Sequence, residues 1–369
     1  MKIAIVVTGG LHPSGREQVT PARLWLIQRL AAANEVHAFA LRHLPEPTDY
    51  ELVGATVHDL GRPEGRWAQW KALRRALVAT GPFDVIHGFL GDPAGMLAAV
   101  AGRRLGMPSV VTCNSGEFTS IPTIGYGSQQ SPQGRAAVAL ACRLATCVHV
   151  TTRFMETRAA PHVSHVTRIP IGVDLEAISS PASRSDGPPW RLLQVASLNR
   201  VKDQSTLLAA VAIAQRSSSV KLDLVGEDTL DGKLQREATS AGLTGSVTFH
   251  GFQPHDVVTR FYRTAHMYVQ SSRHEGGGIA VLEAAAARLP IVGTRVGHVS
   301  DFEPHAAVAV PPGDANALAD AIVKTLRDQI GRRTISARAR QFAESHDANW
   351  TAQQLMALYE SLRVPQSTR

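Results

Sequence analysis

Cysteine is scarce in this sequence. The 369 residues include three cysteines, Cys113, Cys142 and Cys147. Three thiols at these spacings do not make a disulfide framework, and they do not match the ligand spacing of a metal site. We therefore expect them to be small, buried hydrophobic groups in a protein of the reducing cytoplasm.

Long hydrophobic runs are also lacking, although 44% of the residues are hydrophobic and 19% are charged. No apolar run approaches the roughly 20 residues that a membrane-spanning helix needs. The opening MKIAIVVTGG holds one lysine and six apolar side chains, which is too little for a secretory signal. The composition therefore indicates a soluble globular protein, and the length suits two domains.

Aromatic residues make up only 5% of the chain, while the formal net charge is +7. Because no basic run has interleaved aromatic side chains, nucleic acid is disfavoured as a partner. Arginine pairs such as Arg74–Arg75 and Arg103–Arg104 are compatible with a phosphate-bearing substrate or an anionic membrane surface. A basic surface without any partner explains the charge equally well.

The dinucleotide-binding fingerprint G-x-G-x-x-G is absent from the first turn, which disfavours a nicotinamide enzyme. The N-terminal region contains an alternation instead. Residues 2–8 predict a strand, residues 22–33 a helix with one apolar face, and residues 35–41 a second strand. This β-loop-α-β opening predicts a doubly wound α/β domain.

The alternation starts again near Trp190, where RLLQVASL predicts a strand. Residues 177–189 before it are rich in serine and proline and poor in bulky apolar side chains, so they predict an interdomain linker. We therefore expect a first domain over residues 1–176 and a second over residues 190–345. Residues 346–369 are expected to form a terminal helix.

The most informative stretch runs from Ser271 to Gly297. It contains Glu275, the glycines Gly276, Gly277 and Gly278, an alanine-rich run from Ile279, and Glu283. We interpret it as strand, glycine loop, helix, loop and strand. Glycines let backbone N–H groups approach a ligand closely, and a helix N-terminus favours an anion such as a diphosphate. For either feature alone, an ordinary turn or a solvated glutamate is the simpler interpretation.

The motif E-G-G-G-I-A-V-L-E-A, followed by L-P-I-V, G-T-R-V-G and V-P-P-G-D, resembles the E-x7-E signature of glycosyltransferase family 4. The resemblance implies the GT-B architecture, an α/β fold of two doubly wound Rossmann-like domains facing a central cleft. The acceptor would bind to the first domain and the nucleotide-sugar donor to the second. The final helix would cross back to the first domain.

The resemblance also implies the activity. A retaining, metal-independent glycosyltransferase of the hexosyltransferase type would move a sugar from a nucleotide-activated donor to an acceptor hydroxyl. The acceptor would be a glycan, a glycolipid or a small molecule, as in polysaccharide or glycolipid biosynthesis. No cofactor is expected, and no Asp-x-Asp motif after a strand offers a metal site.

In the second domain the resemblance assigns roles residue by residue. The catalytic candidates are Glu275, which would hold the donor sugar, and Lys202, which would neutralise the diphosphate. Arg200 is the third, standing in for an arginine that the family carries where this chain has Ser197. Glu283 would bind the ribose hydroxyls. The other donor-binding candidates are Gly226, Phe252, Gln253, Gly276, Gly277, Gly278 and Ile279.

In the first domain, Gly15 matches the family's glycine in a loop that reaches over the donor diphosphate, and His12 lies nearby in sequence. Asn114 and Glu117 follow the strand PSVVTC, and ligands of open α/β sheets bind at such strand ends. Many relatives carry histidine where Asn114 stands. The loop over residues 118–135 is a plausible acceptor site. The family is usually described by front-face attack, and Glu117 and His12 stay open as alternative nucleophiles or bases.

Two other functions stay open from the sequence. An epimerase or hydrolase on the same architecture would turn over the donor without an acceptor. A non-catalytic nucleotide-sugar-binding protein is favoured by the departures at Ser197 and Asn114. We expect a cytoplasmic protein, with a lipid-linked acceptor and contact with the inner membrane face as open options.

Overall fold

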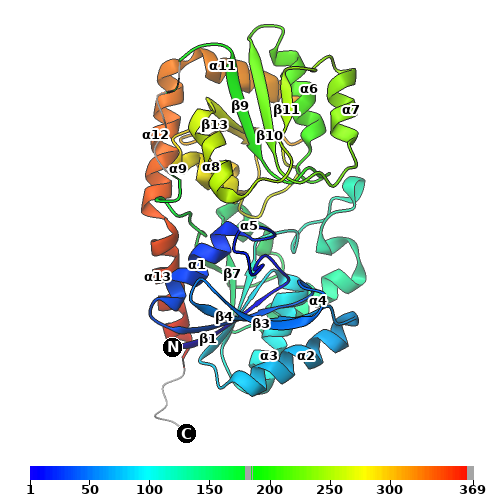
Figure 1. The fold of residues 1–369 in the computed structure, drawn as a ribbon, viewed down its shortest axis with the longest axis vertical. Coiled ribbons are helices and arrows are strands. Elements are labelled where there is room, and N and C mark those ends of the chain that lie inside the picture. Colours follow the sequence, from blue (N-terminus) through cyan, green and yellow to red (C-terminus); the bar gives the residue numbers. More distant parts are fainter. Residues whose placement is uncertain (179–183, 185, 364–369) are drawn as a thin grey trace. The chain divides into compact units, whose positions relative to one another are not determined.

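The computed structural model describes residues 1–178, 184 and 186–363, which form two compact units (Figure 1). The first unit contains residues 1–171 and the segment that starts at Ala348, and the second unit is Gly172–Asp347. The predicted linker, 177–189, lies partly outside the described residues. The predicted domain boundaries therefore stay a prediction.

An eight-stranded sheet forms the centre of the first unit, in the order β3-β4-β2-β1-β5-β6-β7-β8. β3 is antiparallel to β4, and the other neighbouring pairs are parallel. The order reverses beside β1, as in doubly wound folds. The strands are β1 (Lys2–Val7), β2 (Glu35–Ala40), β3 (Pro47–Leu52), β4 (Ala55–Leu60), β5 (Val85–Phe89), β6 (Ser109–Cys113), β7 (Cys147–Val150) and β8 (Thr167–Arg168).

β1 shows why these segments form a sheet that is covered on both faces. Side chains alternate across a strand. Ile3, Ile5 and Val7 therefore pack into one core cluster, and Ala4 and Val6 into another. All five are fully buried, as expected for a central parallel strand. The helices are α1 (Pro21–Ala31), α2 (Gly65–Thr80), α3 (Met96–Leu105), α4 (Pro132–Leu144), α5 (Arg153–Ala159) and α13 (Ala348–Leu362), with short turns η1 (Gly91–Gly95), η2 (Pro122–Ile124) and η3 (Ser128–Gln130).

The last helix, α13, is part of the first unit and packs against α1. Leu355 and Tyr359 are fully buried in the core cluster that α1 also lines. The Tyr359 hydroxyl lies 2.6 Å from Nδ1 of His87 in β5. A tyrosine oxygen at this depth needs such a partner, so the contact fixes the position of α13 on the unit.

The second unit is built on six parallel strands in the order β11-β10-β9-β12-β13-β14. They are β9 (Trp190–Val195), β10 (Val220–Val225), β11 (Val247–Phe249), β12 (Met267–Gln270), β13 (Ile291–Thr294) and β14 (Val308–Val310). Because all are parallel, their carboxyl ends share one edge. The helices are α6 (Gln204–Ala214), α7 (Lys233–Ser240), α8 (His255–Thr264), α9 (Ile279–Ala286), α10 (Gly297–Phe302), α11 (Ala315–Arg327) and α12 (Gln329–Ser345).

The cysteines all carry free thiols. Cys113 is buried, as predicted, while Cys142 and Cys147 are half-buried. Within the described ranges, no helix has both the length and the apolar character needed to cross a membrane.

Candidate functional site

The loop after β9 is folded around the side chain of Asn199. Its Oδ1 accepts hydrogen bonds from the backbone N–H groups of Val201 and Lys202, both at 3.0 Å. Asp203 follows in the left-handed region (φ 51°), and its carboxylate accepts from the Thr206 N–H at the start of α6. Aspartate tolerates this conformation and caps helices well. The local fold thereby sets the position from which Lys202 projects.

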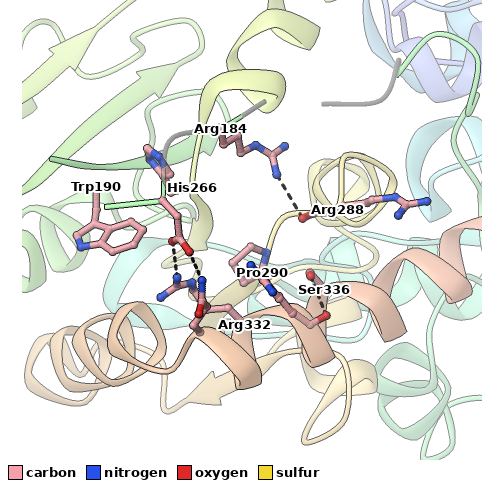
Figure 2. A pocket seen from close by; sticks show the side chains of 10 residues that line it. Arg184, Trp190, His266, Arg288, Pro290, Arg332 and Ser336 are labelled. Carbon is pink, nitrogen blue, oxygen red and sulfur yellow. Dashed lines mark hydrogen bonds and ion pairs between the residues drawn. The ribbon is translucent and has the colours of Figure 1, made fainter. Parts of the chain in front are cut away.

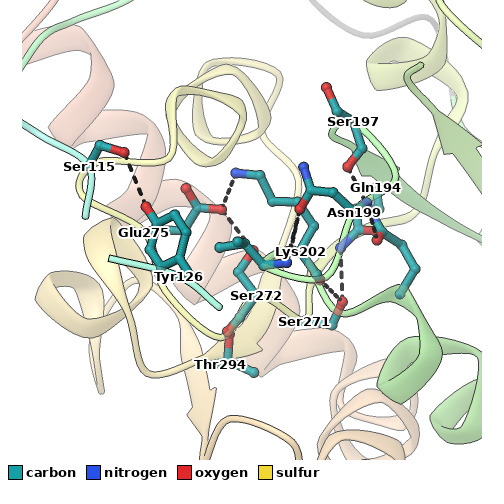
Figure 3. Close-up of polar contacts among 12 residues, drawn as sticks. Ser115, Tyr126, Gln194, Ser197, Asn199, Lys202, Ser271, Ser272, Glu275 and Thr294 are labelled. Carbon is teal, nitrogen blue, oxygen red and sulfur yellow. Dashed lines mark hydrogen bonds and ion pairs between the residues drawn. The ribbon is translucent and has the colours of Figure 1, made fainter. Parts of the chain in front are cut away.

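Lys202 and Glu275 form the central contact of the site (Figure 3). Nζ of Lys202 lies 2.5 Å from Oε1 of Glu275, and the Ser272 hydroxyl donates to the same oxygen at 2.7 Å. The side chains are 26% and 11% exposed, so the ion pair is partly shielded from water. The contact joins the loop after β9 to the loop after β12, and the sequence had not predicted it.

Polar side chains beneath this pair hold the two loops together (Figure 3). The Ser271 hydroxyl donates to the Lys202 carbonyl at 2.8 Å and accepts from Nε2 of Gln194 at 3.1 Å. The Thr294 hydroxyl donates to the Ser272 carbonyl at 2.6 Å. All of these supporting residues are buried. Sequence reasoning missed them, although polar residues at the ends of three buried strands were a usable signal.

The glycine loop joins Glu275 to α9. Gly278 is the N-cap residue of α9, with φ at 89° and no side-chain cap. A Cβ at Gly297 would lie 2.5 Å from the Gly277 carbonyl oxygen and 2.8 Å from Cβ of Glu275. The first N–H groups of a helix lack intrahelical partners, so the uncapped end of α9 suits an anion beside Glu275.

Glu283 lies on the second turn of α9 and is only 3% exposed. Its Oε1 is 2.8 Å from Nε2 of His255, and its Oε2 accepts from the Tyr262 hydroxyl at 2.7 Å. Burial and the adjacent carboxylate raise the pKa of Tyr262 well above its usual range, so the hydroxyl stays a donor. Each carboxylate oxygen has a second lone pair, which the predicted ribose contact requires. His255 and Tyr262 were not predicted.

The structure brings Lys202, and not Arg200, to Glu275. Arg200 and Ser197 are exposed. Within the described part of the chain, the Arg200 guanidinium makes no hydrogen bond or ion pair. A third cation in this region, Arg273, forms an ion pair with Asp203. This pair stabilises the loop that carries Lys202.

Three of the predicted donor-binding residues lie at the same edge of the sheet. Gly226 has φ at 153°, and a Cβ there would lie 2.0 Å from the Ala196 carbonyl oxygen. Its N–H donates to the Gly251 carbonyl at 2.9 Å. Phe252 comes next and is 49% exposed, whereas the Gln253 amide donates to the His250 carbonyl at 2.8 Å. The loops after β9, β10 and β11 are therefore in direct contact.

Glu117 of the first unit is buried inside its own loops. Its Oε1 accepts from the Gly91 N–H at 3.0 Å and its Oε2 from the Ser115 N–H at 2.7 Å. Burial raises the pKa of this carboxyl group. Glu117 thus ties the loop after β5 to the loop after β6, and the structure does not present it as an open nucleophile or base.

The other candidates of the first unit occupy the loops after β1 and β6. Gly15 has φ at 64°, and its N–H donates to the His12 carbonyl at 2.9 Å. Nδ1 of His12 lies 2.9 Å from the Ser14 hydroxyl. Oδ1 of Asn114 is buried and has no hydrogen-bond partner among the described residues, so it can accept from a ligand.

Sequence reasoning also missed Arg23 in the first turn of α1. Its Nη1 donates to the Gly9 carbonyl, and a Cβ at Gly10 would lie 2.7 Å from that nitrogen. Burial lowers the pKa of Arg23 to about 10, so the guanidinium is charged at neutral pH. A cation therefore lies directly beneath the turn after β1.

A separate pocket of about 220 Å³ lies at the opposite, amino-terminal end of the second sheet (Figure 2). Arg332 stacks on the Trp190 ring at 4.7 Å and pairs with Asp186 at 2.7 Å. Arg184 donates to four backbone carbonyls, including those of Tyr262 and Ala287. Because these two arginines are already engaged by the protein, we assign the pocket no substrate.

Two family models match the chain. The model of the glycosyl transferase 4-like domain matches residues 19–172, and the model of the glycosyl transferases group 1 matches residues 177–342. A protein with a glycosyltransferase name, EpsF of Bacillus subtilis, is 28% identical over 234 residues, which are 60% of this chain and 59% of EpsF. The alignment therefore spans less than two thirds of that relative.

A phosphatidyl-myo-inositol mannosyltransferase of Mycobacterium leprae is 28% identical over 309 residues, 79% of this chain and 76% of that protein. Among solved structures, sucrose-phosphate synthase from Thermosynechococcus elongatus has a TM-score of 0.81 at 22% identity, covering 98% of this chain and 99% of that one. HepE of Anabaena, in complex with UDP-glucose, has a TM-score of 0.75 at 19% identity, covering 98% and 100%. These likenesses confirm the predicted α/β fold of the GT-B type.

Proposed function

The chain belongs to the group 1 glycosyltransferases, and from that premise we propose that it transfers a sugar from a nucleoside-diphosphate donor to an acceptor hydroxyl. The observation that carries the proposal is the Lys202–Glu275 pair beside the glycine loop and the N-terminus of α9. A cation, a helix end and a carboxylate meet where α/β sheets bind ligands. The complex of HepE with UDP-glucose supports the class of donor.

The leaving diphosphate gains negative charge as its bond to the sugar breaks. Nζ of Lys202 and the N–H groups at the start of α9 are placed to stabilise that charge. Oε1 of Glu275 is occupied by Lys202 and Ser272, while its Oε2 has no hydrogen bond among the described residues. Oε2 is therefore the atom we assign to a hydroxyl of the donor sugar, which would orient the anomeric carbon.

The reaction in this proposal retains the anomeric configuration and uses no metal. The acceptor oxygen bonds to the anomeric carbon on the face from which the diphosphate leaves, and the departing phosphate oxygen takes the acceptor proton. A double displacement would need an open carboxylate in the first unit. The burial of Glu117, with both oxygens bound by backbone N–H groups, supports the front-face route.

Donor binding is tested first. A thermal-shift series of nucleoside diphosphates and nucleotide sugars is measured in EDTA and then in Mg²⁺, because a ligand of the native state raises the melting temperature. We expect one base to give a shift that Mg²⁺ leaves unchanged and that Lys202→Ala reduces. The exposed Lys233→Ala is the control. A shift that requires Mg²⁺ would overturn metal independence.

Turnover is tested with the donor alone and with a panel of hydroxyl acceptors. Glu275→Gln is expected to lower kcat about 100-fold, by the size of effect seen when a preorganised polar group is removed from a site, with Glu360→Gln as the exposed control. NMR of the product anomer reports retention or inversion. Full turnover in Glu275→Gln would remove the assigned role, and donor consumption without acceptor would favour a hydrolase or epimerase.

We also propose that this enzyme works in the cytoplasm and reaches an anionic membrane through one face of α2. Trp67 and Val78 are 67% and 58% exposed, and Lys71, Arg74 and Arg75 on the same helix are exposed too. Apolar side chains flanked by basic ones suit an anionic lipid surface. We expect cosedimentation with phosphatidylserine vesicles, loss of it in Trp67→Ala, and none with phosphatidylcholine. Equal sedimentation of wild type and variant would reject the contact.

A further inference from the structure

An arginine-lined pocket lies in the first unit, at the carboxyl edge of its sheet. It has a volume of about 600 Å³, and its polar lining is Arg42, Arg62, Glu64, Arg66, Gln69 and Asp92. Arg42 follows the end of β2 by two residues, Arg62 follows β4 by two, and Asp92 follows β5 by three. The size is that of a small-molecule site, and the edge is where such sheets bind ligands.

Two of the three arginines have guanidinium N–H groups without a partner among the described residues. Arg66 is neutralised by Asp92, with Nη2 at 2.5 Å from Oδ2. Arg62 donates one nitrogen to the His43 carbonyl at 3.3 Å. Within the residues that the structure describes, the Arg42 side chain has no hydrogen-bond or ion-pair partner. Guanidinium groups bind phosphate through paired N–H donors, so Arg42 and Arg62 form a receptor for an anionic group.

Two acceptor atoms beside these arginines lack partners. Oε1 of Gln69 and Oδ1 of Asp92 are buried, and neither has a hydrogen bond among the described residues. Gln69 as a whole is only 3% exposed. A buried polar atom without a partner is rare in a native protein. Hydroxyl groups of a ligand are the donors that would satisfy both atoms.

A second pocket of about 350 Å³ continues the same wall, because it shares Arg66 and Asp92. Its lining adds the side chains of Ser115, Tyr126, Ser128, Ser131 and Gln133. Most of them belong to the loop 118–135, which the sequence analysis offered as one place for the acceptor. One end of the combined surface is thus cationic, and the other offers many hydroxyl groups.

We propose that the acceptor is a polyol phosphate, with its phosphate held by Arg42 and Arg62 and its hydroxyls by Gln69 and Asp92. This assignment rests on the proposed transfer reaction, because it names the substrate that receives the sugar. A soluble sugar phosphate and the headgroup of a phospholipid share this chemistry. The hydroxyl that attacks the donor would belong to the same molecule that the arginines anchor.

Binding to the full chain is measured calorimetrically with glucose 6-phosphate, glucose and UDP. The variant Arg42→Gln/Arg62→Gln removes both charges and keeps the side-chain length, and Arg103→Gln, an exposed arginine of α3, is the matched control. We expect the double variant to bind glucose 6-phosphate about 100-fold more weakly, roughly tenfold for each charge-assisted contact. Its affinity for UDP should equal that of wild type, which separates this test from the donor site.

A second experiment distinguishes a soluble sugar phosphate from a phospholipid headgroup as the source of the phosphate. Vesicles of phosphatidylcholine with and without phosphatidylglycerol are compared for Trp67→Ala alone and for Trp67→Ala combined with the double variant or with Arg103→Gln, because Trp67→Ala removes the membrane contact proposed for α2. If only the double variant loses binding to vesicles that contain phosphatidylglycerol, the phosphate belongs to a lipid headgroup. If the double variant loses binding to glucose 6-phosphate but not to these vesicles, the phosphate belongs to a soluble ester. Equal binding of glucose and glucose 6-phosphate, or equal effects of the double variant and Arg103→Gln, would overturn the proposal. Circular dichroism spectra of the variants confirm that each one is folded.

Discussion

At the scale of one residue, Ser197 is the position at which we predict that the proposed donor site lacks a positive charge. The resembled family carries an arginine at this position, and Arg200, the predicted substitute, is exposed and makes no hydrogen bond or ion pair among the described residues. Lys202 is already paired with Glu275. Among the described residues, Lys202 is thus the cation that contacts Glu275 in the proposed donor site, and it is partly neutralised by that contact.

Restoring the arginine should strengthen donor binding. We expect Ser197→Arg to tighten UDP binding about tenfold, the effect of one charge-assisted hydrogen bond, as measured by isothermal titration calorimetry. Ser219→Arg adds the same charge before the amino end of β10 and serves as the control. An equal gain in both variants would show that the effect is general electrostatic attraction, and no gain would place residue 197 away from the diphosphate.

At the scale of elements, the glycine loop depends on close contact with the start of α10. Gly297 has φ at 54°, and a Cβ there would meet the Gly277 carbonyl oxygen at 2.5 Å. Gly242 has φ at 72° and no neighbouring atom within 4 Å of the same position. The two glycines share a left-handed backbone conformation, in which an added side chain would be strained, and they differ in what surrounds them.

Alanine substitutions at these two glycines distinguish the cost of backbone strain from the effect of displacing the glycine loop. Both Gly297→Ala and Gly242→Ala should lose about 1 kcal/mol of unfolding free energy from the left-handed backbone. Only Gly297→Ala should also lower kcat, because the added methyl group pushes the loop that carries Glu275. Urea unfolding and kinetic assays of both variants check this, and equal kcat values would mean that the loop position does not govern turnover.

A chain of buried hydrogen bonds crosses the first sheet. Thr112 lies 2.6 Å from Nε2 of His87 and 2.7 Å from Nδ1 of His149. Burial lowers the pKa of His149 to about 4, and burial together with the nearby His149 lowers the pKa of His87 well below its usual range. Both imidazoles are therefore neutral in the folded protein, while in the unfolded chain they take up a proton below about pH 6.5.

The first unit should consequently lose stability in acid. Because the folded-state pKa values lie below the unfolded ones, the unfolded chain binds more protons as the pH falls from about 6.5 toward 4. His149 alone should account for a loss of about 3 kcal/mol over that window. Urea unfolding at pH 7 and at pH 5 measures the loss, and His149→Gln should reduce it. A urea unfolding midpoint that is the same at both pH values would contradict the prediction that His87 and His149 are neutral in the folded protein.

At the scale of the whole molecule, each unit has its own hydrophobic core. The clusters around β1 belong to the first unit and the cluster around β9 belongs to the second. The first core is completed by α13, which lies about 180 residues after the rest of that unit. Its side chains Leu355 and Tyr359 have no exposed surface.

Removing one side chain of α13 should therefore destabilise the first unit alone. Tyr359→Ala is expected to cost about 3–5 kcal/mol, as large-to-small core substitutions do, whereas Tyr359→Phe should cost about 1 kcal/mol for the lost hydrogen bond. Differential scanning calorimetry should show a lower melting temperature for the transition of the first unit. The transition of the second unit, which UDP should stabilise, should keep its melting temperature. A common shift of both transitions would show that the units unfold together.

The sequence by itself determined the fold class and located the segments of the proposed donor site. Alternating strands and helices follow from local apolar periodicity, and the glycine loop with Glu275 and Glu283 lies within one short segment. The Lys202 loop could also be found, because its position after a strand is a local property. Features of this kind depend on neighbouring residues, so one sequence suffices to predict them.

Only the tertiary structure decided which side chains meet across the loops. It shows Lys202 rather than Arg200 against Glu275, and it shows Glu117 buried between two loops. It also gathers Arg42 and Arg62 into one pocket. These residues come from segments far apart in the chain, and their distances depend on strand order and packing. No local pattern carries that information, because a side chain's partners are selected by the fold as a whole.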